Sequence, residues 1–254
     1  MLLVIDVGNT NTVIGLFKGE HLAENWRIRT IRDSTPDEFN VLLNALFADK
    51  KVSTDAITKT VVSSVVPPAV PILNTWCRRY LAEAPVWVNP ESVKKLMPIR
   101  YSNPGDVGAD RIVNAIAAYN RYRKAMIIID FGTATTFDAI SDKGEYLGGA
   151  IAPGIMISSE ALFHKASKLP RVEIFTPPCA VIGKTTPDSI KSGIIFGNAA
   201  LVDGMVSRMA KEMDGSPMVI ATGGLAPLIG DVSEKIERVD DSLTLEGLRL
   251  IAEN

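Results

Sequence analysis

An internal repeat constrains the fold of this chain more than any other sequence feature. The run Leu-Leu-Val-Ile-Asp-Val-Gly at residues 2–8 returns as Met-Ile-Ile-Ile-Asp-Phe-Gly at residues 126–132. The same offset of 124 residues pairs Asn11 with Thr135 and Thr12 with Thr136. Such a long period indicates duplication of a whole domain, because solenoid repeats have periods of about 20 to 50 residues. The sequence therefore predicts two related domains, at residues 1–123 and 124–254.

Each half is predicted to open with a strand, an Asp-x-Gly turn and two further strands, followed by helices alternating with strands. A helix start is expected at Ser34–Glu38, where a capping residue, a proline and acidic residues follow one another. The strands expected in the first half are Leu2–Asp6, Thr12–Phe17, Ala23–Ile28, Ile57–Val62 and Val86–Val88. Three helices are expected there: one that ends near Asp49, one at Ala69–Leu81 and one at Ala109–Arg123. The elements expected in the second half are strands at 126–130, Phe137–Ile140, Tyr146–Ile151, Met218–Ala221 and Lys235–Val239, and helices at Pro187–Lys211, just after Gly224 and from Leu243.

Composition excludes several classes of partner. The 254 residues carry a net charge of −2, so nothing indicates the clustered basic face that nucleic-acid binding needs. The apolar N-terminal run is interrupted by Asp6 and lacks a basic flank, which argues against a signal peptide or a membrane span. A small-molecule partner is the better expectation.

Cysteine and histidine usage points to a reducing compartment and no zinc. With only two cysteines, Cys77 and Cys179, a disulfide framework is not expected, and a cytoplasmic location fits. The two histidines, His21 and His164, have no cysteine or carboxylate at ligand spacing around them.

The duplicated turn has the residues that a triphosphate site requires. Glycine allows backbone N–H groups to approach phosphate oxygens, and the residues from Asn9 to Thr12 add small neutral donors. Magnesium is usually held by one or two carboxylates together with substrate phosphates, so Asp6 and Asp130 are expected to face the metal. The alternative for either turn alone is a tight hairpin stabilised by side-chain hydrogen bonds. The presence of both turns favours a nucleotide site.

A third glycine turn, Thr222-Gly223-Gly224, follows an apolar strand and precedes a helix, an arrangement that suits close approach of backbone to a nucleotide. Taken alone it is an ordinary turn. The chain contains neither a Walker-type lysine loop nor a GxGxxG fingerprint, so phosphate binding is assigned to the duplicated turns.

The segment from Asn103 to Arg111 concentrates two glycines, two aspartates and an arginine at the entry to a helix. Phosphoryl transfer needs a group that accepts the proton of the attacking hydroxyl, and Asp110 is the candidate. The helix N-terminus and the neighbouring Arg111 are expected to keep Asp110 ionised. Arg111 is expected to bind a substrate carboxylate through two parallel hydrogen bonds. The competing interpretation is a helix-start acid paired with a surface arginine.

These motifs together resemble one family, the type III pantothenate kinases of the actin/hexokinase/Hsp70-like superfamily. The resemblance runs from the first turn through the Gly105–Arg111 segment and the second turn to Gly183-Lys184-Thr185-Thr186. It implies an α/β fold of two ribonuclease H-like domains, each a mixed five-stranded sheet with helices, with ATP in the cleft between them. It also implies ATP-dependent phosphorylation of pantothenate, the first step of coenzyme A synthesis.

The resemblance further implies residue roles, Mg²⁺ with the ATP, a monovalent cation (K⁺ or NH₄⁺) at Asp130, and a homodimer. Asp110 would be the proton acceptor, and either Thr186 or the adjacent Thr185 would contact pantothenate. The residues implied to bind ATP are Asp6, Val7, Gly8, Asn9, Thr10, Asn11, Thr12, Val13 and Thr133, to which the glycine turn adds Gly223 and Gly224. The residues implied to bind pantothenate are Tyr101, Gly108, Ala109, Asp110, Arg111 and Thr186.

Two other functions stay open on the sequence. One is an actin-like kinase of another small hydroxylated substrate. The other is a non-catalytic accessory protein in transcription, a role described for relatives of this family. Retention of Asp6, Asp110 and Asp130 argues for catalysis, because a non-catalytic protein has no need of all three carboxylates.

Overall fold

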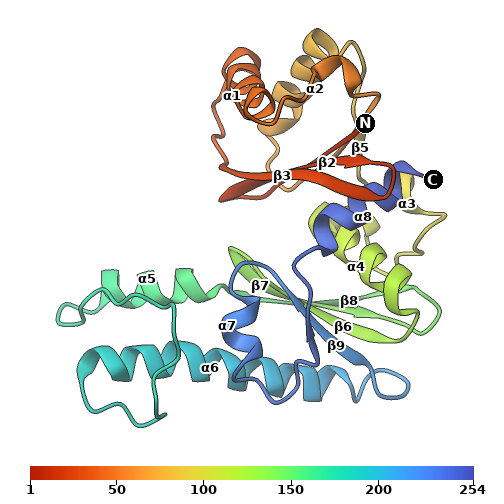
Figure 1. Cartoon of the computed structure of the whole chain (residues 1–254). Helices are drawn as coiled ribbons and strands as arrows, with labels where there is room; N and C mark the ends of the chain where they lie inside the picture. Colours follow the sequence, from red (N-terminus) through yellow and green to blue (C-terminus); the bar gives the residue numbers. More distant parts are fainter. The chain divides into compact units, whose positions relative to one another are not determined.

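The computed structural model describes all 254 residues, and the chain divides into two compact units (Figure 1). Unit 1 comprises residues 1–120 together with Leu243–Asn254, and unit 2 comprises Arg121–Ser242. None of the helices is long and apolar enough to cross a membrane.

Unit 1 is built on a five-stranded mixed sheet in the order β3-β2-β1-β4-β5. The central strand β1 pairs antiparallel with β2 and parallel with β4, which explains why its residues are apolar almost throughout. The outer pairs are β2 with β3, antiparallel, and β4 with β5, parallel. The strands are β1 Leu2–Val7, β2 Asn11–Lys18, β3 His21–Arg29, β4 Lys59–Ser64 and β5 Val86–Trp87.

Helices α1 (Pro36–Asp49) and α2 (Ala69–Tyr80) cover one face of this sheet (Figure 1). Thr35 caps α1 at the predicted helix start: its side chain accepts the N–H of Glu38, whose carboxylate accepts the N–H of Thr35 in return. The core between these helices and the sheet includes Trp76 and Phe47, both fully buried.

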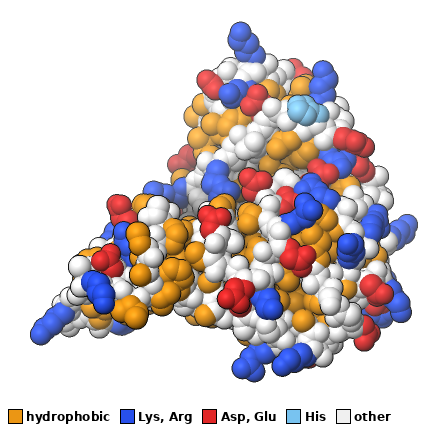
Figure 2. All heavy atoms as spheres, turned by 60° about the horizontal axis from the view of Figure 1, so that its bottom comes forward, with side chains coloured by type: hydrophobic (Ala, Val, Ile, Leu, Met, Phe, Trp, Pro, Cys, Tyr) orange, Lys and Arg blue, Asp and Glu red, His pale blue; other side chains and the backbone are white.

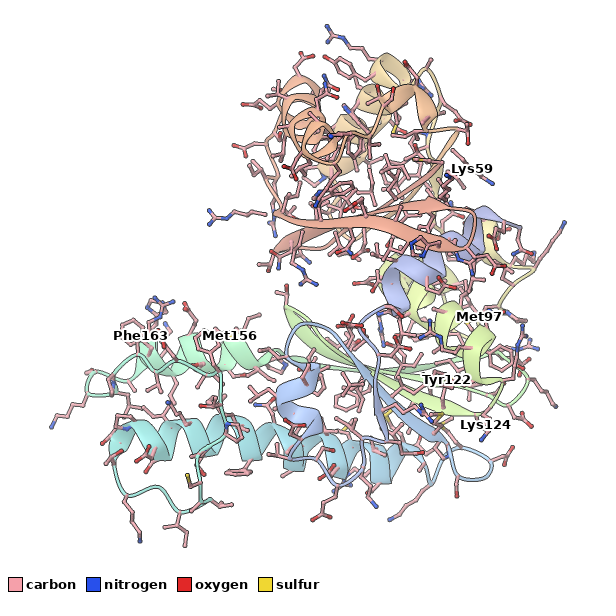
Figure 3. All side chains as sticks on the ribbon, in the orientation of Figure 1. Lys59, Met97, Tyr122, Lys124, Met156 and Phe163 are labelled. Carbon is pink, nitrogen blue, oxygen red and sulfur yellow. The ribbon has the colours of Figure 1, made fainter.

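The C-terminal helix α8 (Leu243–Ala252) packs against β1, β2 and β4 of the same sheet. Lys59 of β4, labelled in Figure 3, donates a hydrogen bond to the carbonyl of Ala252. α8 also lies directly against α4 (Ala109–Tyr122): a Cβ atom on Gly247 would lie 2.2 Å from the carbonyl oxygen of Val113. The predicted boundary, which placed residues 243–254 in the second domain, is therefore wrong for this helix, because its apolar side is buried in unit 1.

Unit 2 repeats the sheet topology of unit 1. Its order, β10-β9-β6-β7-β8, matches that of unit 1 when β6 is aligned with β1, and every pair has the same sense. The strands are β6 Met126–Phe131, β7 Ala134–Ile140, β8 Tyr146–Pro153, β9 Met218–Thr222 and β10 Arg238–Val239. The prediction of two related α/β domains with mixed five-stranded sheets is confirmed.

Within this duplication, the predicted residue correspondence is wrong beyond the turn. Val7 pairs with Thr12 across the first hairpin, whereas Phe131 pairs with Thr135 across the second. The second turn is therefore one residue shorter, and the structural counterpart of Thr12 is Thr135 instead of Thr136.

Helices α5 (Ile155–Lys165) and α6 (Thr186–Met209) run side by side in unit 2, and α7 (Ala226–Gly230) follows β9 (Figure 1). The sequence predicted α6, α7 and α8 but missed α5, whose apolar residues do not follow one helical stripe. The short helix α3 (Pro90–Val93) and 3-10 turns at Thr54–Ala56 and Pro104–Asp106 lie in predicted loops.

Candidate active site

Asp6 stands at the carboxyl end of the central strand of unit 1. Its Cα partners are Val13 on β2 and Ser63 on β4, so the three side chains leave the same face of the sheet. Ser63 is fully buried, and its hydroxyl has no hydrogen-bond partner within the protein. A buried hydroxyl without a partner beside a carboxylate is unusual and marks this strand end as a place where a polar ligand fits.

The turn after Asp6 is closed by a hydrogen bond of 3.0 Å from the N–H of Gly8 to the carbonyl of Asn11. A Cβ atom on Gly8 would lie 3.0 Å from that same oxygen, so this position suits glycine. Thr12 is buried at 4% exposure, whereas Asn9 and Thr10 at the tip are exposed. The tip of the turn is therefore open to a ligand.

The candidate base Asp110 lies close to this turn, within the same unit. Val65, which follows β4, donates its N–H to the carbonyl of Val7 over 3.1 Å. The side chain of Val65 also approaches Gly108, where an added Cβ would lie 3.5 Å from Val65 Cγ1. Gly108 in turn faces Asp110, whose Oδ1 would lie 2.6 Å from that Cβ. Unit 1 thus brings the first turn and the entry to α4 together through Val65.

The electrostatics of Asp110 differ from the prediction. Burial raises the pKa of its carboxyl above the ordinary value, and the backbone N–H and positive charge of Arg111 offset only part of this effect. The N–H of Arg111 donates to Asp110 Oδ1 over 2.8 Å. Desolvation is therefore the larger effect on this pKa, and the prediction from the helix start and Arg111 did not take it into account. A raised pKa makes the carboxylate a stronger base.

Two of the residues predicted to bind pantothenate differ sharply in exposure. Arg111 is only 8% exposed, which argues against the alternative of a surface arginine paired with a helix-start acid. Tyr101 is 39% exposed, and the loop from residue 101 to residue 106 lies at the surface.

In unit 2, the turn after Asp130 meets the predicted glycine turn. Gly223 has φ +93°, and a Cβ there would lie 2.6 Å from Asp130 Oδ1 and 2.7 Å from the carbonyl oxygen of Phe131. Only glycine allows this conformation and this approach without strain. The backbone of Gly223 therefore lies against the carboxylate of Asp130.

Gly154, immediately after β8, closes the other side of the second turn. A Cβ on Gly154 would lie 2.1 Å from the carbonyl oxygen of Thr133. The sequence analysis missed Gly154 and its counterpart Thr30, which follows β3. The offset of 124 residues links these positions too, but their side chains differ, so no identity signalled them.

Thr186 lies in a different part of unit 2. It lines a pocket of about 700 Å³ between α5 and α6, together with Lys184, Ser189 and Leu162. Thr185 is the N-cap of α6: its oxygen accepts the N–H of Asp188 over 3.2 Å. Helix α5 separates this pocket from the Thr133 turn, and its 11 residues span about 16 Å. Within unit 2, Thr186 and Thr133 are therefore not neighbours.

No group of three or more His, Cys, Asp or Glu side chains is arranged to hold a metal ion. Each turn presents one carboxylate, Asp6 in unit 1 and Asp130 in unit 2. This donor set fits a magnesium ion that keeps its waters and is held mainly by a nucleotide's phosphates.

Comparisons with known proteins identify the family of this chain. Residues 2–208 match the family model for type III pantothenate kinase. A type III pantothenate kinase of Desulforapulum autotrophicum is 71% identical over 253 residues, which cover 100% of this chain and 97% of that protein.

Solved structures resemble this chain in fold. A conserved Campylobacter jejuni protein assigned to the Baf family of transcriptional activators has a TM-score of 0.63 at 18% identity, covering 99% of this chain and 97% of its own. A Sinorhizobium meliloti protein assigned as a 2-dehydro-3-deoxygalactonokinase has a TM-score of 0.59 at 11% identity, covering 100% of this chain and 96% of its own. At such low identity these two structures bear on the fold alone. The family model and the closely similar kinase cover most or all of the sequence, and on that evidence the chain belongs to the type III pantothenate kinase family.

Proposed function

We propose that this protein transfers the γ-phosphoryl group of ATP to the primary hydroxyl of pantothenate, giving 4′-phosphopantothenate at the start of coenzyme A synthesis. The observation that carries the proposal is the placement of Asp110 beside the first turn through Val65 and Gly108. A proton acceptor and a phosphate-binding turn are then available within one unit.

The two turns would bind the nucleotide. Asp6 and the turn residues up to Val13 would take the phosphates in unit 1, and Thr133, Gly223 and Gly224 would contact ATP in unit 2. Mg²⁺ carried by the nucleotide neutralises charge that develops on the transferred phosphoryl group. The Asp6 carboxylate would orient waters of that ion, and Asp130 would bind a monovalent cation, K⁺ or NH₄⁺.

Asp110 would accept the proton of the pantothenate hydroxyl as its oxygen attacks the γ-phosphorus. Burial supports this role because it raises the pKa of the carboxyl, so the proton is taken more readily. The N–H of Arg111 holds one carboxylate oxygen at 2.8 Å and fixes the orientation of the group.

The acceptor site would consist of Tyr101, the segment Gly108–Arg111 and Thr186. The buried guanidinium of Arg111 suits a bidentate bond to the pantothenate carboxylate. Thr186 is preferred over Thr185 because the Thr185 hydroxyl also donates to Asp188 Oδ2 over 2.7 Å, so it is occupied at the helix cap.

We also infer a cytoplasmic homodimer. The region of α5 and the loop that follows it exposes apolar side chains, including Met156 and Phe163, which lie near the two ends of α5 (Figure 3), and Phe175 and Ile182, which are 71% and 74% exposed. In Figure 2, hydrophobic side chains are visible, among charged ones, on the arm of unit 2 at the left of the view, which carries α5 and the N-terminal part of α6. A large exposed apolar patch is typical of a protein interface.

A coupled assay would test the function. The purified protein with ATP and Mg²⁺ is offered pantothenate, a hexose or no acceptor, and product is identified by mass. We expect phosphate transfer to pantothenate only. Transfer to the sugar instead would identify another actin-like kinase, and nucleotide binding without any transfer would favour the non-catalytic alternative.

A further inference from the structure

We propose that Thr30 is a positioning residue for the phosphate-binding turn, which we define as Gly8–Thr12. It holds the Gly8–Asn9 peptide so that the N–H of Asn9 faces the side of the sheet that carries Asp6. The inference rests on the proposed function in one respect, since it takes ATP as the ligand of this turn. It adds to the ATP site a residue outside the turn, one residue beyond the end of β3.

Three hydrogen bonds connect Thr30 to the turn. Its hydroxyl donates to the carbonyl of Gly8 over 2.7 Å, and its backbone N–H donates to the carbonyl of Thr10 over 3.0 Å. The hydroxyl oxygens of Thr12 and Thr30 are 2.9 Å apart. Because a hydroxyl has a single hydrogen and that of Thr30 goes to Gly8, Thr12 is the donor in this pair. One residue thus fixes three of the five residues of the turn.

A second contact from the same segment reaches the tip of the turn. The guanidinium of Arg32 donates from Nη2 to the side-chain oxygen of Asn9 over 3.0 Å. This pair is exposed and contributes little to stability. It places a positive charge at the point where the turn opens to solvent.

The direction of the Gly8 carbonyl decides where the next N–H points. Val7, Thr12 and Thr30 line a pocket of about 420 Å³ with Phe39 of α1 and Leu73 of α2, so all three lie on the helix-covered face. Asp6 precedes Val7 on β1, and consecutive strand residues alternate between faces, so Asp6 lies on the opposite side.

In a trans peptide the C=O and the following N–H point in opposite directions. Because Thr30 draws the carbonyl of Gly8 to the helix-covered face, the N–H of Asn9 is turned to the Asp6 face. Backbone N–H groups bind phosphate oxygens, whereas a carbonyl in the same place would repel them. Thr30 therefore sets the polarity of the turn toward its ligand.

The second copy of the domain shows that the fold does not require this arrangement. The counterpart of Thr30 is Gly154, which has no hydroxyl and packs its backbone against Thr133. Thr135, the counterpart of Thr12, is 1% exposed, and its hydroxyl has no hydrogen-bond partner within the protein. The hydroxyl contact is thus specific to the first turn, although both turns have the same strand pairing.

Two substitutions at Thr30 test the inference. Thr30→Val removes the hydroxyl at nearly constant volume, and Thr30→Ser keeps it. The matched control is Thr58→Val, which also removes a hydroxyl that donates to a backbone carbonyl in unit 1, that of Met1, over 3.3 Å. For Thr30→Val we expect the Kd and the KM for MgATP to rise about tenfold, the effect of losing one well-formed hydrogen bond. The KM for pantothenate should stay unchanged, and Thr30→Ser and Thr58→Val should bind MgATP like the wild type.

Unchanged MgATP affinity in Thr30→Val would overturn the inference, as would an equal weakening for ATP and pantothenate. If Thr30→Val does not fold, hydrogen exchange on the wild type decides. The amide of Asn9 should exchange fast without nucleotide and slowly with MgATP, while that of Thr30 is slow in both states. If the exchange rate of the Asn9 amide does not change when MgATP is added, the inferred direction of this N–H is wrong. The Kd for MgATP and the exchange of the Asn9 amide are measured without turnover. A protein that binds ATP through this turn but does not phosphorylate pantothenate would therefore refute only the proposed function.

Discussion

Gly108 and Asp110 are in close contact: a single added carbon on Gly108 would lie 2.6 Å from Asp110 Oδ1. Glycine at this position is therefore part of what places the carboxylate. The same oxygen receives the N–H of Arg111, so Asp110 is held from two sides of the entry to α4.

Gly108→Ala should lower kcat, because the new methyl group must displace the Asp110 carboxylate. We expect a fall of about tenfold or more, since misplacement of a reacting group by a fraction of an ångström is costly. The matched control is Gly105→Ala in the same loop, where the nearest atom to an added Cβ is at an ordinary 3.5 Å. Steady-state kinetics of the two variants provide the test, and equal activities would contradict the close contact.

Asp110→Asn should abolish most turnover while nucleotide binding survives. Removal of a general base costs about 10² to 10⁴ in rate, whereas the turns that bind ATP are untouched. Asp55→Asn, an exposed aspartate of unit 1, serves as the control. Single-turnover rates and calorimetric titration with MgATP measure the two properties separately. If Asp110→Asn turns over at the wild-type rate, Asp110 is not the general base.

The pH dependence of stability provides an independent check on Asp110. Burial raises the pKa of its carboxyl in the folded protein, so folding favours the protonated form. The protonated carboxyl's contribution to the free energy of unfolding is complete below the unfolded pKa and is lost as pH rises through the folded pKa. Asp110→Asn should therefore melt at a higher temperature than the wild type at pH 7, and this difference should vanish in acid. Thermal melts from pH 4 to pH 8 test this, and a variant less stable at pH 7 would contradict it.

Gly223→Ala should weaken nucleotide binding and lower the melting temperature. The added Cβ would meet Asp130 Oδ1 and the carbonyl of Phe131, and the backbone there has φ +93°. Strain of this kind costs about 1 to 3 kcal/mol. Gly204→Ala is the control: it lies within α6 with no atom within 4 Å of the added carbon, and a helical Gly→Ala change stabilises by about 1 kcal/mol. Opposite shifts in melting temperature are expected; a shift of the same sign in both would be inconsistent with the crowding at Gly223.

Gly247→Ala should destabilise unit 1 in particular. The new Cβ would lie 2.2 Å from the carbonyl of Val113, so α8 must move away from α4 and from the sheet. Hydrogen exchange resolved by segment should show faster exchange in β1 and β4, while β6 and β9 are protected as before. Faster exchange in β6 and β9 instead would indicate that residues 243–254 belong to the second domain, as the sequence predicted.

The duplication, the succession of strands along the chain and six of the eight α-helices followed from the sequence, because buried central strands and amphipathic helices leave periodic apolar patterns. The helix α5 left none, since much of its surface is exposed and apolar at once: Met156, Ile157 and Leu162 are each between 38% and 47% exposed. Its identification depended on the tertiary structure.

The carboxylates and glycine turns of the site were also readable in the sequence, because Asp, Gly and Thr at strand ends carry a direct chemical meaning. The tertiary structure alone decided three matters: that α8 belongs to unit 1, that Thr12 corresponds to Thr135, and that desolvation outweighs Arg111 at Asp110. It also brought Thr30 to the first turn. Each depends on which atoms pack together across many residues of chain, and local sequence patterns do not encode such distances.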